Sequence, residues 1–243
     1  MKAALLQHLV DQASAPYRPA GPWAWHFARG KLKGDPLFAA LLEPGLLPET
    51  GRYLDLGCGQ GLLASWLLAA AGTPPQGPAA DLAHPLPRML AYHGVDMQAH
   101  SVAHASQALA GSPLPLQLEV DDMCTAPLPP ADVVTLFDVL HYVPPAAQEM
   151  LLRRIRASLP HDGRLLLRVG DAAAGLPHHL SRLVDSLVVL GHGGGWPRLH
   201  CRSAASWCAL LRELGFATGI RPMPGAGFAN TLILARPTRT PLS

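Results

Sequence analysis

Residues 53–67 read YLDLGCGQGLLASWL, and this stretch decides the fold. An apolar segment with one acid, Asp55, runs into glycines at 57, 59 and 61 and continues directly into a helix-like apolar segment. Glycine is costly in regular structure, but at a strand-to-helix turn it permits φ > 0 and close approach of a ligand to the main chain. Such a ligand also faces the positive end of the next helix. We interpret Gly57, Gly59 and Gly61 as the floor of a nucleotide-type site; a plain turn is the alternative.

The spacing of the glycines restricts the ligand. A dinucleotide fingerprint would place its third glycine at position 62, which is Leu62, and a phosphate-binding loop would need a lysine after the glycines. Neither is present, so the floor suits a nucleoside without phosphates. Asp55, two residues before the first glycine, would repel a phosphate and suits a ligand with an ammonium group. A turn-capping role for Asp55 is the alternative.

This segment resembles motif I of the class I S-adenosylmethionine-dependent methyltransferases, an acid and one residue followed by GxGxG. In that family the acid lies near the amino group of the methionine moiety, and the glycines pack under the nucleoside. The resemblance therefore implies that five residues bind the cofactor S-adenosylmethionine: Asp55, Gly57, Cys58, Gly59 and Gly61.

The alternation of apolar strands and helices from residue 52 onward predicts a mostly parallel sheet covered on both faces. The last two strands are joined by only a few residues and must run antiparallel, because a parallel pair needs a crossover of about a dozen. We therefore predict an α/β, doubly wound, Rossmann-like seven-stranded sheet with an antiparallel C-terminal strand. Strands are expected near 52–56, 90–96, 115–120, 131–137, 163–169, 217–223 and 229–236, and helices near 61–71, 98–110, 145–158, 176–190 and 203–214.

Acids follow the second and third predicted strands. YHGVDM (92–97) ends in Asp96, whose two oxygens can accept both hydroxyls of a ribose. The resemblance assigns Asp96 to the ribose and adds Met97 to the cofactor site; a helix N-cap is the alternative for Asp96. In LEVDDMCTAPLP (118–129) it implies that Asp122 accepts the adenine amino group and that the N–H of Met123 faces the ring. Asp121 is the rival for this role, and two solvated loop acids are the alternative.

The fourth predicted strand and its exit read DVVTLFDVLHYVPP (132–145). Ligands of open parallel sheets sit beyond the carboxyl ends of the strands. We assign Phe137 to the cofactor site, and His141 and Tyr142 as candidate catalytic residues, His141 as a general base or an orienting donor. A structural histidine at a helix start is the alternative. The stretch resembles the family's acid-x-Leu-His segment and lacks the Asn/Asp-Pro-Pro-aromatic signature of methyltransferases that modify DNA bases or protein glutamine.

The first 50 residues are predicted to form a helical cap or lid before a methyltransferase domain at 51–243. Its helices are expected to be broken by Pro16, Pro19, Pro22 and Pro36. In PWAWHFARGKLKGD (22–35), a basic residue could pair with the carboxylate of the cofactor, and aromatic faces could cover the sulfonium or the acceptor. Solvated basic residues on a packed helix are the alternative. The basic candidates are Arg29, Lys31 and Lys33, and the aromatic ones are Trp23, Trp25 and Phe27.

Residues 171–203 are predicted to form a substrate-pocket insertion. They contain four histidines and a run of three glycines, but no HxxxH or HExxH spacing. We therefore predict a pocket wall or lid and no metal site. The residues concerned are His178, His179, His192, His200 and Gly193, Gly194 and Gly195.

Composition excludes several classes of protein. Hydrophobic residues make up 49% and charged residues 15% of the 243-residue chain, so wholesale disorder is excluded. A net charge of +2 is too small to favour nucleic acid or an anionic membrane. No apolar run reaches the length of a membrane span, and the four cysteines form no CxxC pair. We expect a cytoplasmic monomer or homodimer with reduced thiols, no membrane span and no nucleic-acid partner.

A more local resemblance concerns the acceptor. FARGKLKGDPLF (27–38), GWPRLHCRS (195–203) and GFANTLILARP (227–237) are similar to segments of methyltransferases that accompany bacterial aryl-polyene pigment biosynthesis. This resemblance implies secondary metabolism and a small, aromatic or polyketide-like acceptor, methylated on oxygen or carbon. Two other functions stay open: a methyltransferase of RNA or protein, and a non-catalytic protein that binds S-adenosylmethionine.

Overall fold

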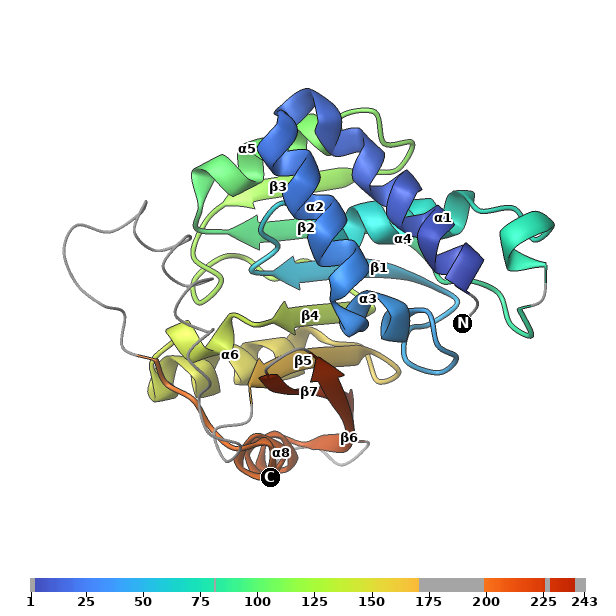
Figure 1. The fold of residues 1–243 in the computed structure, drawn as a ribbon. Helices are drawn as coiled ribbons and strands as arrows, with labels where there is room; N and C mark the ends of the chain where they lie inside the picture. The colour runs from blue at the N-terminus through green and yellow to red at the C-terminus, as the bar shows by residue number, and fades with distance from the viewer. Residues whose placement is uncertain (1–2, 81, 171–198, 226–227, 239–243) are drawn as a thin grey trace. The chain divides into compact units, whose positions relative to one another are not determined.

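The computed structural model begins with helices and then alternates strands and helices, as the sequence predicts (Figure 1). Its contacts divide the chain into two compact units, residues 1–135 and residues 136–243, which we describe separately. The structure describes residues 3–80, 82–170, 199–225 and 228–238.

The first unit opens with helical segments whose starts coincide with prolines. Proline stands in the first turn of η1, α2 and α3, where its fixed φ and missing N–H are tolerated. The elements are α1 (Ala3–Ser14), η1 (Ala15–Ala20), α2 (Pro22–Gly34), α3 (Pro36–Leu41), β1 (Thr50–Leu56), α4 (Leu62–Gly72), η2 (Gly77–Ala79), β2 (Arg88–Asp96), α5 (Ala99–Leu109), β3 (Leu116–Val120) and β4 (Val133–Phe137), whose last two residues belong to the second unit.

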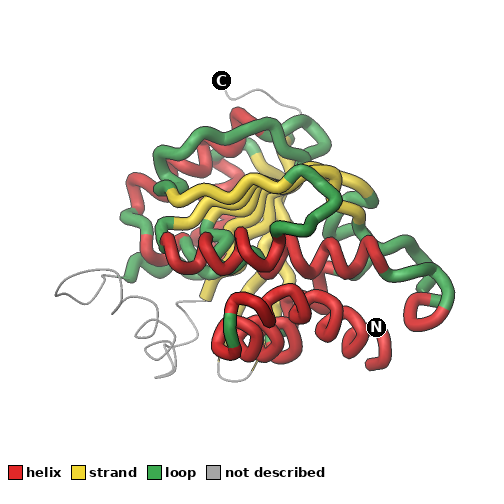
Figure 2. The backbone as a smooth tube through the Cα atoms, turned by 90° about the horizontal axis from the view of Figure 1, so that it is seen from above, coloured by secondary structure: helices red, strands yellow, loops and turns green. Residues whose placement is uncertain are grey.

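The described strands form one seven-stranded sheet in the order β3-β2-β1-β4-β5-β7-β6. β1 pairs in parallel with β2 and β4, and β2 pairs in parallel with β3. Two strands of the second unit, β6 (Phe216–Gly225) and β5 (Arg164–Gly170), each pair antiparallel with β7 (Phe228–Pro237). The predicted mostly parallel sheet with an antiparallel C-terminal strand is therefore confirmed. Figure 2 shows the strands, in yellow, beside the helices, in red.

The N-terminal helices of the first unit are attached to the turn after β1 and to the helix that follows it. The Tyr17 hydroxyl donates to the Gln60 carbonyl over 2.7 Å, and the Ser65 hydroxyl donates to the Ala13 carbonyl over 2.7 Å. Tyr17 is fully buried. Figure 1 shows α2 passing in front of β1 and β2. α1 and η1 are thus bonded to the glycine-rich turn and to α4.

The second unit contains an apolar strand, β5, and two amphipathic helices. Leu165, Leu166 and Leu167 of β5 are fully buried, and Arg168 follows them with only 3% of its surface exposed. The other elements of this unit are η3 (Leu140–Tyr142), α6 (Pro145–Ser158) and α8 (Ala204–Glu213).

The helix predicted near 176–190 and most of the predicted insertion at 171–203 lie outside the described residues. Across the described ranges, no helix combines the length and apolar character needed to cross a bilayer.

Candidate functional site

The turn between β1 and α4 has the backbone that the three glycines predict. Gly57, Gly59 and Gly61 have φ of 83°, 52° and 70°, in the region that L-residues avoid. The N–H groups of Gly57 and Cys58 both donate to the carbonyl of Val95, at 2.7 and 3.1 Å. The turn is therefore fixed against the end of β2.

The glycines differ in what surrounds them. A Cβ at Gly61 would lie 3.0 Å from Leu109 Cδ1 and 3.2 Å from Ala105 Cβ, so this glycine lets α5 pack against the turn. A Cβ at Gly59 would meet nothing within 4 Å. Gly59 thus borders open space from which a ligand can approach the backbone, whereas Gly61 serves packing.

Asp55 is buried in β1, with 4% of its surface exposed. The Tyr92 hydroxyl donates to its Oδ2 over 2.7 Å, and the Thr135 hydroxyl donates to its Oδ1 over 2.6 Å. Burial raises the pKa of the Asp55 carboxyl to about 6; the two hydroxyls oppose this shift, and nearby Asp96 adds to it. An ionised carboxylate has about four acceptor positions, so two hydroxyls do not exhaust it.

Gln60 lies between the second and third glycines and is buried, with 5% exposed. Its side-chain Oε1 has no hydrogen-bond partner within the described part of the chain. A buried acceptor without a donor costs free energy and calls for an explanation. A ligand that carries N–H or O–H donors would satisfy it. Sequence reasoning missed Gln60, although a polar residue between the glycines was a signal.

Asp96 at the end of β2 connects the turn to α5. Its Oδ2 accepts from the Gly59 N–H and its Oδ1 accepts from the Gln98 N–H, each over 2.8 Å. Each oxygen retains acceptor capacity, so the geometry fits a diol while Asp96 also caps the turn. Met97 follows and is 61% exposed.

The pair of acids after β3 forms a tight turn. Asp121 Oδ1 accepts from the Asp122 N–H over 2.7 Å, and Asp122 Oδ1 accepts from the Cys124 N–H over 2.8 Å. The Asp121 N–H donates in turn to the Asp96 carbonyl, which brings this turn beside the end of β2. Met123 is partly buried. The choice between Asp121 and Asp122 for the adenine amino group stays open.

In the second unit, an acid and a buried arginine fix the exit from β4. Asp138 has φ of 59°, a conformation that non-glycine residues seldom adopt. Arg168 donates from Nε to its Oδ1 over 2.8 Å and from Nη2 to its Oδ2, and the Asp138 N–H donates to the Arg168 carbonyl. Sequence reasoning missed this partner, although an arginine within the strand RLLLRVG signals a nearby carboxylate.

His141 and Tyr142 lie in η3, with ring centroids 4.1 Å apart. Burial lowers the pKa of His141, and the charge of Asp138 opposes this shift. Burial also raises the pKa of Tyr142. Phe137 is partly buried at the end of β4. At neutral pH these effects favour a neutral imidazole and a protonated phenol.

A buried amide holds the turn that carries these two side chains. Gln148, fully buried in α6, donates from Nε2 to the carbonyls of Leu140, Val143 and His200, over 2.9–3.1 Å. Arg202 donates to its Oε1 over 2.8 Å. The His200 N–H donates to the His141 carbonyl over 2.8 Å, so η3 is also joined to the segment before α8.

Comparison with protein families decides the identity of the chain. Residues 24–218 match the family described as "Methyltransferase domain". The chain belongs to this methyltransferase family. A comparison with curated proteins finds no match.

Solved structures similar to this methyltransferase-family chain have the same fold. An O-methyltransferase family protein from Burkholderia thailandensis is 16% identical, with a TM-score of 0.60 over 91% of this chain; the chain spans 62% of its length. Magnesium protoporphyrin IX methyltransferase (ChlM) from Synechocystis PCC 6803, with bound SAH, is 18% identical, with a TM-score of 0.56 over 92% of this chain and 93% of its own. The O-methyltransferase NcsB1 from neocarzinostatin biosynthesis, in complex with S-adenosylmethionine and 2-hydroxy-5-methyl naphthoic acid, is 21% identical, with a TM-score of 0.56 over 93% of this chain and 60% of its own.

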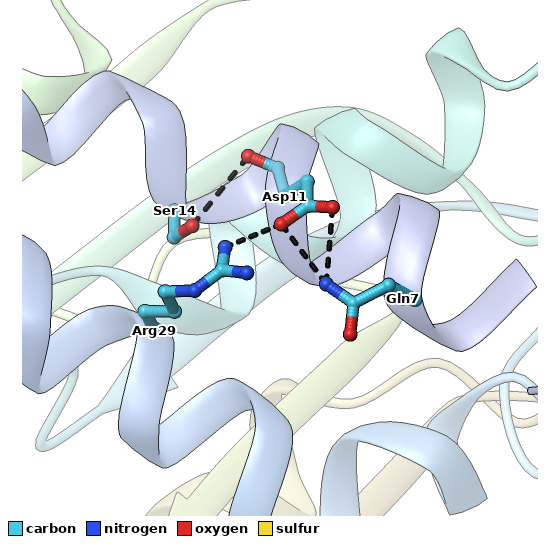
Figure 3. A network of polar contacts seen from close by, with 4 residues as sticks. All are labelled: Gln7, Asp11, Ser14 and Arg29. Carbon is cyan, nitrogen blue, oxygen red and sulfur yellow. Dashed lines mark hydrogen bonds and ion pairs between the residues drawn. The ribbon is translucent and has the colours of Figure 1, made fainter. Parts of the chain in front are cut away.

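In this methyltransferase-family chain, two of the three predicted cations of α2, Arg29 and Lys31, already have carboxylate partners. Arg29 pairs with Asp11, which also accepts from Gln7 (Figure 3). These two donors hold the pKa of Asp11 below its usual range. Lys31 pairs with Asp35 over 2.9 Å. Either cation would therefore have to leave its partner to meet a ligand carboxylate; Lys33 is exposed.

The aromatic residues of α2 form two separate contacts. Trp23, 57% exposed, stacks on Phe27 with ring centroids 5.4 Å apart and lies 6.2 Å from the His104 ring of α5. Trp25 lies under the guanidinium of Arg18 at 5.4 Å. Their predicted role as a cover for the sulfonium or the acceptor stays a prediction.

Among the histidines of the predicted insertion, only His200 falls within the described ranges; His178, His179 and His192 lie outside them, as do the three glycines. In the part of the chain that the structure describes, no group of three or more histidine, cysteine or acidic side chains could hold a metal ion.

Proposed function

We propose that the chain is an S-adenosylmethionine-dependent methyltransferase that transfers a methyl group to a small-molecule acceptor. The observation that carries this proposal is the turn after β1. Its glycines have positive φ, and a Cβ at Gly59 would meet nothing within 4 Å. The turn follows the buried carboxylate of Asp55, and its Gly59 N–H donates to the carboxylate of Asp96. This combination suits a ligand with an ammonium group and a ribose but no phosphate.

The residues of the first unit bind and orient the cofactor. Asp55 faces the ammonium group, Asp96 accepts from the ribose hydroxyls, and Asp122 accepts from the adenine amino group beside Met123. Arg29 or Lys31 pairs with the carboxylate after leaving its present partner. Cys58 and Met97 contribute the remaining surface. When bound, the cofactor would supply a methyl group on a sulfonium, whose leaving group is neutral and good. Transfer would then depend mainly on holding the acceptor atom in line with the methyl group.

The residues of the second unit handle the proton of the acceptor. An acceptor O–H must lose its proton before or during transfer. Because burial lowers the pKa of His141, its imidazole is neutral at pH 7 and can accept that proton. Tyr142 remains protonated because its pKa is raised, so it orients the acceptor as a donor.

A small acceptor is favoured over a macromolecule. A net charge of +2 is too small to attract nucleic acid electrostatically. The neighbours ChlM and NcsB1 are named for small molecules, and the local resemblance to aryl-polyene methyltransferases suggests an aromatic or polyketide-like acceptor in secondary metabolism. The protein would then act in the cytoplasm, where the cofactor is made.

Calorimetry with S-adenosylhomocysteine, NAD and ATP tests the proposal. S-adenosylhomocysteine should bind and raise the melting temperature, because a ligand selective for the folded state stabilises it. NAD and ATP should do neither. Methyl transfer from labelled cofactor to a panel of phenols and polyketide-like acids then tests the acceptor class. Preference for NAD or ATP would overturn the cofactor, and transfer to RNA or protein alone would overturn the acceptor.

A further inference from the structure

Asp55 belongs to a buried cluster built by three neighbouring strands. It stands on β1, Tyr92 on β2 and Thr135 on β4, and Asp55 and Thr135 are partners in the register of the sheet. None of the three exposes more than 4% of its surface. Each oxygen of the Asp55 carboxylate receives one hydroxyl, at 2.7 Å from Tyr92 and 2.6 Å from Thr135. The carboxylate is therefore held from both sides within the sheet.

A glycine makes room for the Tyr92 ring. The residue paired with Asp55 on β2 is Gly94. A Cβ at Gly94 would lie 2.8 Å from Tyr92 Cε1 and 2.9 Å from Cys58 Sγ, and Cβ atoms in proteins essentially never come this close to other heavy atoms. The ring of Tyr92 thus occupies the space that any other residue at position 94 would fill. This arrangement lets a side chain two residues before Gly94 reach across to Asp55.

Among the described residues, the groups that act on the Asp55 carboxyl include no cation. Tyr92 from β2 and Thr135 from β4 are neutral donors, while Cys58 in the glycine turn and Asp96 at the end of β2 are its other titratable neighbours. Burial raises the pKa of Asp55 to about 6, and the two hydroxyls limit this rise. The hydroxyls therefore keep the carboxylate charged near neutral pH without neutralising it.

From this geometry we infer that Tyr92 and Thr135 are positioning residues, which hold Asp55 as an oriented, charged carboxylate for the ammonium group of the cofactor. The inference rests on the proposed function, because it needs a ligand with an ammonium group. It adds two residues that touch Asp55 and not the ligand.

The experiment compares four variants with the parent protein. Tyr92→Phe and Thr135→Val each remove one hydroxyl and keep the shape of the side chain. Thr135→Ser retains a hydroxyl and should rescue the loss. Tyr53→Phe is the matched control, because it removes a buried phenol hydroxyl from β1 that does not donate to Asp55. Carboxyl carbon NMR of the ligand-free proteins follows the titration of Asp55, and calorimetry at pH 5.5–9 follows the affinity for S-adenosylhomocysteine.

The parent should bind S-adenosylhomocysteine more weakly as the pH falls through about 6, where Asp55 takes up a proton. Loss of one hydrogen bond to a charged group should raise the titration midpoint of Asp55 by roughly one to two pH units in Tyr92→Phe and Thr135→Val. Affinity at pH 7 should then fall by roughly two- to tenfold, the factor by which the ionised fraction decreases. The difference should largely close by pH 9. Thr135→Ser and Tyr53→Phe should follow the parent.

The outcomes separate the inference from the proposed function. If the parent does not bind S-adenosylhomocysteine at any pH, the proposed function is rejected. NMR of the ligand-free variants then still measures whether the two hydroxyls lower the titration midpoint of Asp55. If the parent binds and Thr135→Val shows the parent's midpoint and affinity profile, the inference is overturned while the function stands. Equal loss in Thr135→Val and Thr135→Ser would also overturn it, because packing would then be the cause. The Thr135 pair decides the question even if Tyr92→Phe does not fold.

Discussion

Two acids, one in each unit of the molecule, are held in opposite ways. Asp55 in the first unit is 4% exposed and is bonded by two neutral hydroxyls. Asp138 in the second unit has a side chain that is 31% exposed and is bonded by the guanidinium of Arg168. The charge of Asp55 is oriented but not neutralised, so it remains available to a cationic ligand. The charge of Asp138 is neutralised by its ion pair with Arg168, and this pair fixes the turn after β4. Whether a carboxylate near the end of a strand keeps its charge for a bound molecule or stabilises a turn thus depends on whether its hydrogen-bond donors are neutral or cationic.

The largest expected effect separates chemistry in the second unit from binding in the first. His141→Ala should lower turnover with a phenolic acceptor by about 10²–10⁴-fold, the usual value of general-base assistance. Affinity for S-adenosylhomocysteine should stay near the parent value. The variant's rate should rise with pH where the parent's is flat, because the acceptor must then ionise unaided. Steady-state kinetics across pH 6–10 measure this, and normal turnover would make His141 structural.

Asp138→Ala tests the ion pair between Asp138 and Arg168. It leaves Arg168, 3% exposed, without this carboxylate, and removing one member of a buried ion pair typically costs about 3–5 kcal/mol of unfolding free energy. Partial exposure of Asp138 places the expected loss near the lower value. Urea unfolding measures it. Asp132→Ala is the control, because Asp132 is as exposed as Asp138, but its partner Arg52 is 49% exposed where Arg168 is 3% exposed, so this pair should matter much less. Equal losses in the two variants would contradict the role of Asp138.

Asp55→Asn tests the buried acid of the first unit through the pH dependence of the unfolding free energy. Burial raises the pKa of Asp55 to about 6 in the folded protein, from the value of 3.8 that is usual for an exposed aspartate. Its contribution to stability is therefore fully present below the unfolded value and is lost as pH rises through about 6. Relative to Asp55→Asn, the parent should lose about 3 kcal/mol of unfolding free energy between pH 3.5 and pH 7. Urea unfolding at several pH values checks this; parallel pH profiles for the two proteins would mean that Asp55 is not perturbed.

Asp96→Ala concerns cofactor affinity alone. The variant loses an ionic acceptor for the ribose, worth about 1.5–3 kcal/mol, so affinity for S-adenosylhomocysteine should fall roughly 10- to 150-fold. The fold should persist, since the contacts of the Asp96 carboxylate within the described ranges are to two backbone N–H groups, those of Gly59 and Gln98. Calorimetry with circular dichroism measures both. Unchanged affinity in Asp96→Ala would place the ribose on another residue.

The sequence by itself determined the path of the chain. The alternation of strands and helices along most of the chain, three glycines spaced two apart, and a short link between the last two strands were enough to predict the sheet and the antiparallel strand, because these features depend on local backbone rules. The position of Asp55 before the glycines and the resemblance to the class I methyltransferases singled out Asp55 and Asp96 as candidate cofactor residues.

Only the tertiary structure decided which partners these acids have. Tyr92 and Thr135 reach Asp55 from strands 37 and 80 residues away, Tyr17 reaches Gln60 over 43 residues, and Arg168 reaches Asp138 over 30. Each contact depends on strand register or helix docking, and no local pattern encodes either. The Asp11 partner of Arg29, 18 residues away, is a further example. A side chain's type is therefore readable from the sequence, but its charge state and its free acceptors are set by neighbours that only folding brings together.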